Sequence, residues 1–247
     1  MKILTLNCQR AHHKIALIEF LLKVTKSEEY DAIFLQEIPQ EIIGDVDPHN
    51  LYNHISDRSI RTTNGRVALL LKKEYEIMTT DHCLFERQKT EYKEYFFELI
   101  SVVCRGQDSK TYILSSLHMP AYLHFIRRIG HLRKVLWRIK KLKKQNHKDS
   151  VVVTGGDWNS VFPLEHNLLS LTLDSRYKFI FGRQPTVSAS KIEPGLFWNN
   201  FVKKVSSIIK LDYVVDFFFI NRKMKAQISV IESDVSDHNP VALIIKD

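Results

Sequence analysis

Side chains that bind metal ions and phosphate groups recur at the ends of short apolar segments. Seven residues share this position: Asn7, Glu37, His118, Asp157, Asn159, Asp237 and His238. The set contains two carboxamides, three carboxylates and two imidazoles. Carboxylate and amide oxygens are suitable ligands for Mg²⁺, and an imidazole can contact or protonate a phosphate ester. The residue types therefore point to metal and phosphate chemistry.

Each of these residues has an ordinary alternative explanation when it is taken alone. An Asn or Asp after a strand commonly forms a turn, and a single His at a strand end is commonly a surface residue. Strand ends converge in packed sheets, however, so residues far apart in sequence can meet in one cleft. The repetition of the pattern favours a shared site over seven unrelated causes.

The elements that must position this site are short strands and a few helices. Apolar and β-branched runs predict strands at residues 3–6, 31–36, 66–71, 92–103, 110–117, 150–154, 214–220, 227–231 and 241–245. Helical spacing predicts helices at 14–26 and 123–144, and we expect irregular structure at 40–65 and 160–211. The second helix has an apolar stripe of Ile126, Ile129, Leu132, Leu136, Ile139 and Leu142. No linker divides the chain, so we expect one α/β domain over residues 1–247.

The net charge of +8 comes from one segment. Residues 127–148 hold ten Lys or Arg and no Asp or Glu, which leaves 26 basic and 28 acidic residues elsewhere. The overall charge is therefore a weak indicator of nucleic-acid binding. The hydrophobic fraction of 44% and the charged fraction of 26% are ordinary for a globular protein.

Targeting and cysteine signals are weak. We find no apolar run long enough to span a bilayer, and the first ten residues are too polar for a signal peptide. Three cysteines at wide spacing argue against a disulfide framework, and the lack of a Cys-x-x-Cys pair argues against a zinc ribbon. These features predict a cytoplasmic protein, or a nuclear one if the source is eukaryotic.

The order of the motifs resembles the endonuclease/exonuclease/phosphatase superfamily, which includes deoxyribonuclease I-like and exonuclease III-like proteins. The matching pieces are Thr5-Leu6-Asn7, Leu35-Gln36-Glu37, Ser116-Leu117-His118, Gly156-Asp157-Trp158-Asn159, Val215-Asp216-Phe217 and Ser236-Asp237-His238-Asn239-Pro240. They span almost the whole chain, and the chain resembles the short, stand-alone members. The resemblance implies a four-layer αββα sandwich of two packed mixed β-sheets with outer helices.

The resemblance also implies a magnesium site, in which Mn²⁺ is a possible substitute. Glu37 matches the metal-binding carboxylate, Asn7 assists it, and Asp237 matches a position at or near the metal. Asp157 matches the residue that orients or deprotonates the attacking water. Asn159 matches a residue that hydrogen-bonds a phosphate oxygen.

Two imidazoles match catalytic positions of the same superfamily. His238 matches the imidazole that touches the scissile phosphate, and His118 matches a second one that stabilises the phosphate or assists the leaving group. Which group acts as base and which as acid stays open. His238 needs a carboxylate on its other nitrogen, and we prefer Asp216 to Asp212 because Asp216 would otherwise be an unpaired charge inside a strand.

The substrate is the least determined feature. We place Arg10, Tyr122, Arg127 and Trp158 at the substrate-binding surface. For Trp158 a role as a cleft-wall or core aromatic is favoured over base stacking. The charge and the superfamily's commonest activity favour a nuclease or a DNA-end repair phosphodiesterase that acts as a monomer without an obligate protein partner. One alternative is a phosphatase or phospholipase acting on an inositol phosphate or a lipid headgroup. Another is a non-catalytic scaffold of the same fold.

Overall fold

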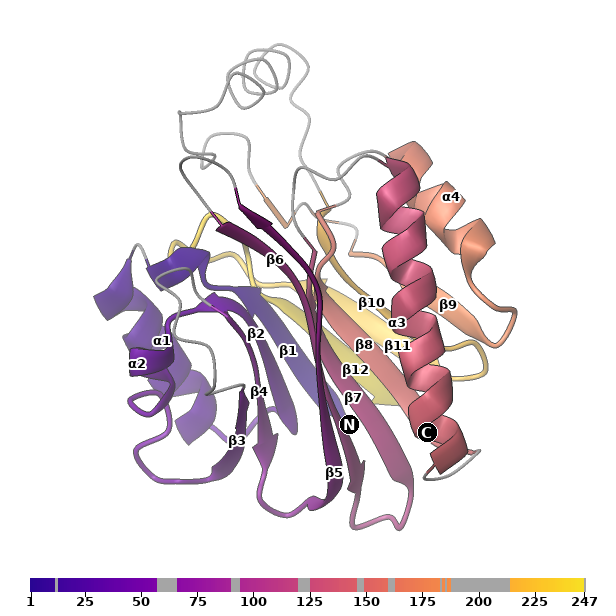
Figure 1. Ribbon diagram of the computed structural model, residues 1–247. Coiled ribbons are helices and arrows are strands. Elements are labelled where there is room, and N and C mark those ends of the chain that lie inside the picture. The colour runs from indigo at the N-terminus through magenta and orange to yellow at the C-terminus, as the bar shows by residue number, and fades with distance from the viewer. Residues whose placement is uncertain are drawn as a thin grey trace.

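Two six-stranded β-sheets face each other in the computed structural model (Figure 1). The model describes residues 1–11, 13–56, 66–89, 94–119, 125–145, 149–159, 163–182, 184, 186–187 and 214–246. In spatial order, the first sheet contains β11 (Lys225–Val230), β12 (Val241–Lys246), β1 (Lys2–Asn7), β2 (Ala32–Ile38), β4 (Arg66–Lys72) and β3 (Tyr52–Ser56). The second contains β5 (Glu76–Lys89), β6 (Glu94–Arg105), β7 (Thr111–His118), β8 (Val151–Asp157), β10 (Asp216–Asn221) and β9 (Tyr177–Ile180).

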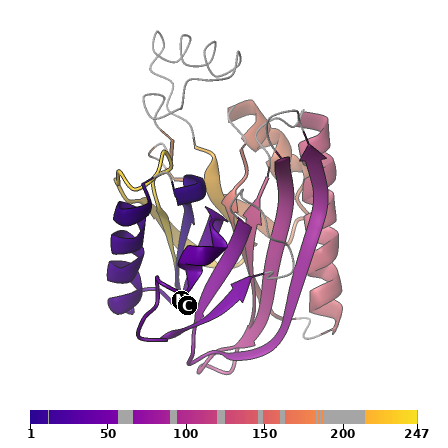
Figure 2. The same ribbon diagram turned by 60° about the vertical axis from the view of Figure 1, so that its left-hand side comes forward.

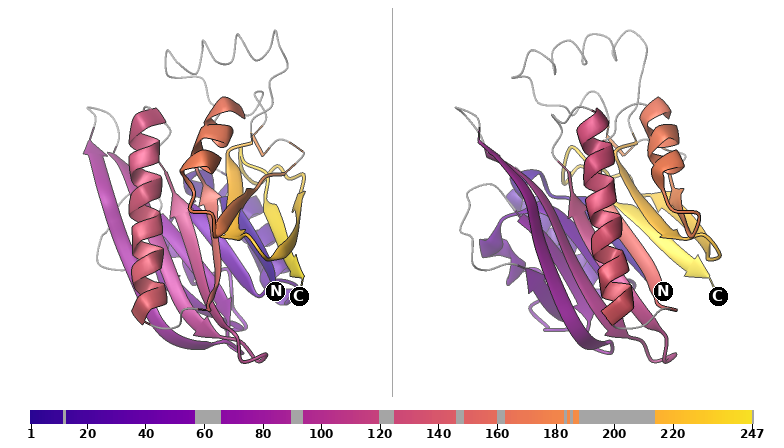
Figure 3. Two further views of the ribbon diagram at one scale, coloured as in Figure 1. Left: turned by 90° about the vertical axis from the view of Figure 1, so that its right-hand side faces the viewer. Right: turned by 45° about the vertical axis from the view of Figure 1, so that its right-hand side comes forward.

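Helices cover the outer faces of the two sheets. The helices α1 (Lys14–Lys26) and α2 (Gln40–Ile43) lie on the side of the first sheet, preceded by a short 3-10 turn, η1 (Gln9–Ala11). The helices α3 (Phe125–Gln145) and α4 (Pro163–Thr172) lie outside the second sheet (Figures 2 and 3). The predicted four-layer sandwich is confirmed. Among the described residues, no helix has the length and apolar character needed to cross a membrane.

Alternating side chains of the central strands fill three separate cores. Ile3 faces the other sheet, whereas the next residue, Leu4, packs in the core beneath α1. Phe217 likewise packs toward the α3 side, and Phe218 packs between the sheets. Because these strands are buried on both faces, they read in the sequence as continuous apolar runs.

Strand direction brings the polar strand ends to one edge of the sandwich. In the first sheet β1 and β2 run parallel, with Asn7 opposite Gln36. In the second sheet β7 and β8 run parallel, with His118 opposite Asp157. The strands β10 and β12 are antiparallel to β8 and β1, so their starting ends reach the same edge. The convergence expected from the sequence follows from this topology.

The structure differs from the sequence-based prediction in three regions. Residues 40–65 and 160–211 were expected to be irregular, but they contain α2, β3, α4 and β9. Strand β5 was not predicted at all. These elements are short or polar, and their pairing with a neighbouring strand or sheet decides their conformation.

The apolar stripe predicted on α3 is partly wrong. Ile126 is 81% exposed, whereas Leu132, Ile139 and Leu142 are buried as expected, together with Val135. Ile126 is the second residue of α3, in the first turn of the helix.

Candidate active site

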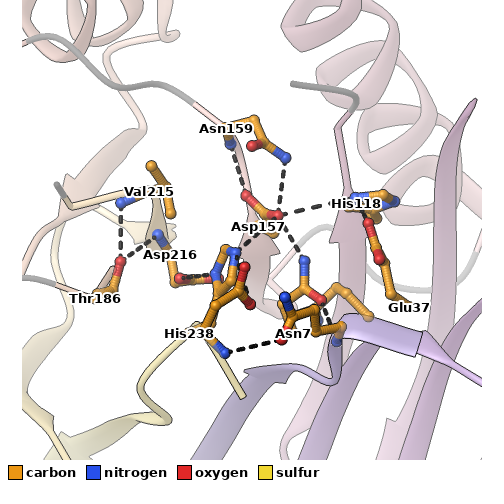
Figure 4. A network of polar contacts seen from close by, with 12 residues as sticks. Asn7, Glu37, His118, Asp157, Asn159, Thr186, Val215, Asp216 and His238 are labelled. Carbon is orange, nitrogen blue, oxygen red and sulfur yellow. Dashed lines mark hydrogen bonds and ion pairs between the residues drawn. The ribbon is translucent and has the colours of Figure 1, made fainter. Parts of the chain in front are cut away.

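Asp157 lies at the centre of the converging strand ends (Figure 4). Its Oδ2 accepts hydrogen bonds from Asn7 Nδ2 and from Asn159 Nδ2, both at 2.8 Å. Its Oδ1 accepts the backbone N–H of Asn159 at 2.8 Å. The side chain of Asp157 is 1% exposed, so its orientation is fixed by these contacts and links the two sheets.

Backbone conformation at the strand ends aims several of these side chains. Glu37 has a φ of 50° at a register irregularity of β2, and Asn159 has a φ of 47°. Non-glycine residues rarely adopt positive φ, and such strain is concentrated at functional sites. The bulge turns Glu37 out of the alternation of β2, toward the neighbouring strand ends.

A carboxylate–imidazole pair adjoins Asp157. His238 Nδ1 lies 2.7 Å from Asp216 Oδ2, and His238 Nε2 lies 3.9 Å from Asp157 Oδ2. Thr186 Oγ1 accepts the backbone N–H groups of Val215 and Asp216, which fixes the start of β10 (Figure 4). Asp216 therefore occupies the position predicted for the partner of His238, whereas Asp212 lies outside the described residues.

Ser236 joins this pair to the first sheet. Its Oγ donates to the backbone oxygen of Asn7 at 2.7 Å and accepts the backbone N–H of His238 at 3.2 Å. Asp237 lies beside it, with Oδ1 3.9 Å from His238 Nε2. The loop before β12 is thereby fixed against the end of β1.

The second imidazole lies on the opposite side of Asp157. His118 Nε2 is 3.3 Å from Glu37 Oε1 and 3.8 Å from Asp157 Oδ2. Asn7 completes the set, because its Oδ1 accepts the backbone N–H of Gln9 at 2.9 Å while its Nδ2 faces Asp157. The structure thus brings together all eight predicted catalytic and metal-site residues.

The charges of the site perturb one another. Burial raises the pKa of Asp157 to about 6, and the negative charge of Asp216 contributes to the rise. Burial lowers the pKa of His238, but Asp216 and the other nearby carboxylates outweigh it and hold the pKa well above its usual value. Burial likewise lowers the pKa of His118, and Glu37 more than offsets this effect. The pKa shifts therefore favour the protonated form of both imidazoles, beside a carboxyl group whose pKa lies near 6.

The donor set fits a divalent cation that prefers oxygen. Burial raises the pKa of Asp237, and the negative charge of Glu37 adds to the rise. Both effects disfavour negative charge at this position, and a bound cation would relieve them. Glu37 and Asp237 are each 20% exposed and can take a ligand from solvent. Asn7 Oδ1 accepts one hydrogen bond and retains a second lone pair. Such hard oxygen ligands suit Mg²⁺.

A second group of side chains could also bind a metal ion. Asp157, Asp216 and His238 have ligating atoms that all lie within 4.8 Å of one another. The 2.7 Å contact between Asp216 and His238 would have to open before both could bind one ion. The metal ligands predicted from the sequence, Glu37, Asn7 and Asp237, are a different set and stay a prediction.

Solved structures with the same arrangement of strands identify the fold. An endonuclease/exonuclease/phosphatase protein from Bacteroides vulgatus matches with a TM-score of 0.72 and 15% identity, over 99% of this chain and 98% of that chain. This chain has the endonuclease/exonuclease/phosphatase fold. No family model matches the sequence, and no curated protein matches it, so the likeness is one of structure.

Two further structures with the endonuclease/exonuclease/phosphatase fold differ in activity. TDP2 from D. rerio, complexed with a single-strand DNA product, matches with a TM-score of 0.73 and 15% identity, over 100% of this chain and 99% of that chain. The mannosyl-6-phosphatase Bt3783 from Bacteroides thetaiotaomicron matches with a TM-score of 0.72 and 12% identity over 100% of both chains. The resemblance stated from the motifs is thus confirmed for the fold.

The predicted substrate-binding residues are only partly placed. Trp158 is fully buried, stacks on Phe217 at 5.2 Å between ring centroids and donates Nε1 to the Phe217 backbone oxygen. Its predicted contact with substrate is therefore wrong, because burial gives it a packing role. Arg127 is exposed at the start of α3. Tyr122 and the side chain of Arg10 lie outside the described residues.

A buried ion pair behind His118 was not predicted. Glu98 stands opposite His118 in the β6–β7 register and accepts two hydrogen bonds from Arg66, at 2.6 and 2.8 Å. His82 Nε2 lies 2.7 Å from the same carboxylate. A second polar link between the sheets joins Gln36 Nε2 to Ser116 Oγ at 3.0 Å. The only sequence signal for either is a polar residue inside an apolar strand.

Proposed function

We propose that this protein is a divalent-metal-dependent phosphoesterase that hydrolyses phosphodiester bonds in nucleic acid. The observation that carries the proposal is Asp157, held by two asparagines between two imidazoles and beside Glu37. Phosphate-ester hydrolysis needs a positioned water, neutralised phosphate charge and a proton for the leaving oxygen. Each requirement has a candidate group within this site.

The proposed chemistry assigns one task to each group. Asp157, with a pKa raised to about 6, orients the attacking water and accepts its proton. His238, kept protonated by Asp216, donates a hydrogen bond to a phosphate oxygen. Asn159 supports the phosphate, and His118 assists the leaving group. A bound Mg²⁺, held by Glu37, Asn7 and Asp237, would supply a positive charge to the phosphate.

Nucleic acid is the preferred substrate for two reasons. The D. rerio TDP2 structure of the same fold holds a single-strand DNA product, and residues 127–148 of this chain hold ten Lys or Arg and no Asp or Glu. A small phosphate ester is the second candidate, because a mannosyl-6-phosphatase shares the fold over the full length of both chains. The inositol phosphate or lipid-headgroup alternatives belong to this second class.

A substrate panel tests the proposal. Single-stranded, double-stranded, abasic and 5′-tyrosyl DNA, RNA, inositol phosphates and sugar phosphates are incubated with Mg²⁺ or with EDTA. We expect cleavage of nucleic acid only with Mg²⁺. Activity that persists in EDTA would refute the metal-dependent mechanism, and turnover restricted to small esters would favour the second candidate.

The Asp157→Asn variant identifies the responsible site. The change keeps the side-chain size but removes the proton acceptor, so we expect kcat to fall by about 10²–10⁴-fold. The control is Glu232→Gln, which changes an exposed carboxylate just before the loop that carries His238. This variant should keep the wild-type kcat. Equal turnover of Asp157→Asn and wild type in purified samples would support the non-catalytic scaffold instead.

A further inference from the structure

The outer face of α3 combines positive charge with an exposed aromatic ring. Helix α3 contains nine Lys or Arg residues and no acidic residue. Seven- and four-residue spacings place one set of exposed residues along its outer side, and we call this set the α3 outer face: Ile126, Arg133, Trp137, Lys140, Lys141 and Lys144. Trp137 is 61% exposed, although an indole of this size is normally well buried.

Some of the other charged side chains near α3 are paired or buried. Arg138 pairs with Asp81 of β5, and Arg128 is buried. Asp174 pairs with Arg176. Asp174 also interacts with Lys140, so it offsets part of the positive charge of the α3 outer face. Lys141 Nζ lies 5.9 Å from the centre of the Trp137 ring.

The topology connects this face to the candidate active site. The strands β7 and β8 are parallel and end at His118 and Asp157, and α3 is the crossover between them. The helix therefore begins at the edge that carries the site and runs back along the outside of the second sheet (Figure 3). From Ile126 to Lys144 the face extends about 27 Å, at 1.5 Å per residue, which accommodates several nucleotides.

We propose that the α3 outer face binds single-stranded nucleic acid, with the Lys and Arg side chains on phosphates and a base stacked on Trp137. Single-strand binding surfaces combine cations that follow the backbone with aromatic rings that stack bases. A membrane fits less well, because interfacial helices insert a continuous apolar face, whereas Arg133 separates Ile126 from Trp137. The inference rests on the proposed function for its ligand class, and it adds a binding surface outside the catalytic groups.

Binding is measured by fluorescence anisotropy of a labelled oligodeoxythymidylate in EDTA, so that hydrolysis does not interfere. Lys140→Glu/Lys141→Glu/Lys144→Glu should raise Kd at least about 10-fold and lower the slope of log K against log salt by about 2. Lys23→Glu/Lys26→Glu/Lys73→Glu reverses three exposed charges on the opposite side of the sandwich and is the control. The control should change Kd less than about 2-fold.

A second pair of variants tests the stacked base. Trp137→Ala should raise Kd by about 5- to 100-fold, and Trp137→Phe should retain most of the affinity. All variants should hydrolyse bis(p-nitrophenyl) phosphate at the wild-type rate, because this small ester does not reach α3. Because all the substituted side chains are exposed, their circular dichroism spectra and melting temperatures should match those of the wild type.

Three results would overturn the inference. The first is wild-type affinity for the oligonucleotide in the α3 variants, and the second is an equal loss of affinity in the control variant. The third is binding of phosphatidylserine vesicles through α3 without binding of the oligonucleotide. Binding through α3 without cleavage of any nucleic acid would instead refute the proposed function and leave the inference intact. Nucleic-acid cleavage and affinity that are the same in the α3 variants as in wild type would refute the inference and leave the proposed function intact.

Discussion

Asp157 shows how a single residue depends on both sheets. Its carboxylate is fixed by Asn7 of the first sheet and by Asn159, and its pKa responds to Asp216 and the two imidazoles. Each neighbour contributes either a hydrogen bond that orients the Asp157 carboxylate or a charge that shifts its pKa. The chemistry of the candidate site therefore depends on polar contacts that orient buried side chains. Charges interact strongly there because the site is shielded from water.

The Asp216→Asn variant tests the charge that acts on His238. Loss of the carboxylate should lower the pKa of His238 from its raised value, so the imidazole should lose its proton at a lower pH than in wild type. The midpoint is read from the His238 resonance by NMR in the presence of EDTA. The control is Glu232→Gln, and an unchanged His238 midpoint in Asp216→Asn would contradict the assignment of this pair.

The strands position these residues through their direction and also through close contacts between neighbouring strands. At the end of β8, Gly156 has a φ of 143°, and a Cβ there would lie 2.0 Å from the Leu117 backbone oxygen. The neighbouring strands can approach only because this side chain is absent. Behind His118, the buried Arg66–Glu98 pair joins β4 of one sheet to β6 of the other.

Gly156→Ala should damage both stability and the site. The residue has a positive φ and its new methyl group meets backbone, so we expect a loss of about 3 kcal/mol or more in the free energy of unfolding. Urea denaturation measures the loss, and hydrolysis should fall as Asp157 is displaced. Gly44→Ala is the matched control, because φ is −70° and nothing lies within 4 Å of the new Cβ. Equal stability of the two variants would contradict the close contact.

Glu98→Gln should destabilise the protein, because Arg66 is 4% exposed and would keep a buried charge without its partner. Breaking such a pair costs about 3–5 kcal/mol. The exposed pair of Arg105 with Glu76 supplies the control, Glu76→Gln, for which urea denaturation should show almost no change.

The same carboxylate predicts a pH dependence of stability. Burial raises the pKa of Glu98, but hydrogen bonds from His82 and Arg66 outweigh it and lower the pKa below its usual value. The unfolded chain therefore takes up the proton first, and this contribution to stability is lost as pH falls through the folded pKa. Wild type should lose stability more steeply than Glu98→Gln at acid pH, and parallel curves would contradict the prediction.

At the scale of the whole molecule, the site exists only where the two sheets meet. The first sheet supplies Asn7, Glu37 and the loop with His238, and the second supplies His118, Asp157 and Asp216. The predicted metal ligands Asn7, Glu37 and Asp237 all come from the first sheet and the loop before β12, so a bound cation would join three segments of that sheet. Ligand binding to the folded state alone raises its stability.

Mg²⁺ should therefore raise the melting temperature. At 100 times its Kd the expected gain is about 2.7 kcal/mol, or about 5–10 °C for a chain of this size. Differential scanning calorimetry should show the shift in wild type, its reversal by EDTA and a much smaller shift in Glu37→Gln. A NaCl sample of equal ionic strength controls for screening. An equal shift in both proteins would place the cation elsewhere.

The sequence by itself determined the strands that are buried on both faces, the long helix and the residue types of the site. Continuous apolar runs and the polar residues that end them are local signals, which explains why the strands and the α/β class were predictable. The four-layer sandwich was predicted from the resemblance of the motifs instead. The sequence also favoured Asp216 as the partner of His238, and the 2.7 Å contact agrees with that preference. Only the tertiary structure decided that Trp158 is in the core and that Glu98 pairs with Arg66. These outcomes depend on register and on packing between sheets, because contacts across long sequence separations leave no local pattern.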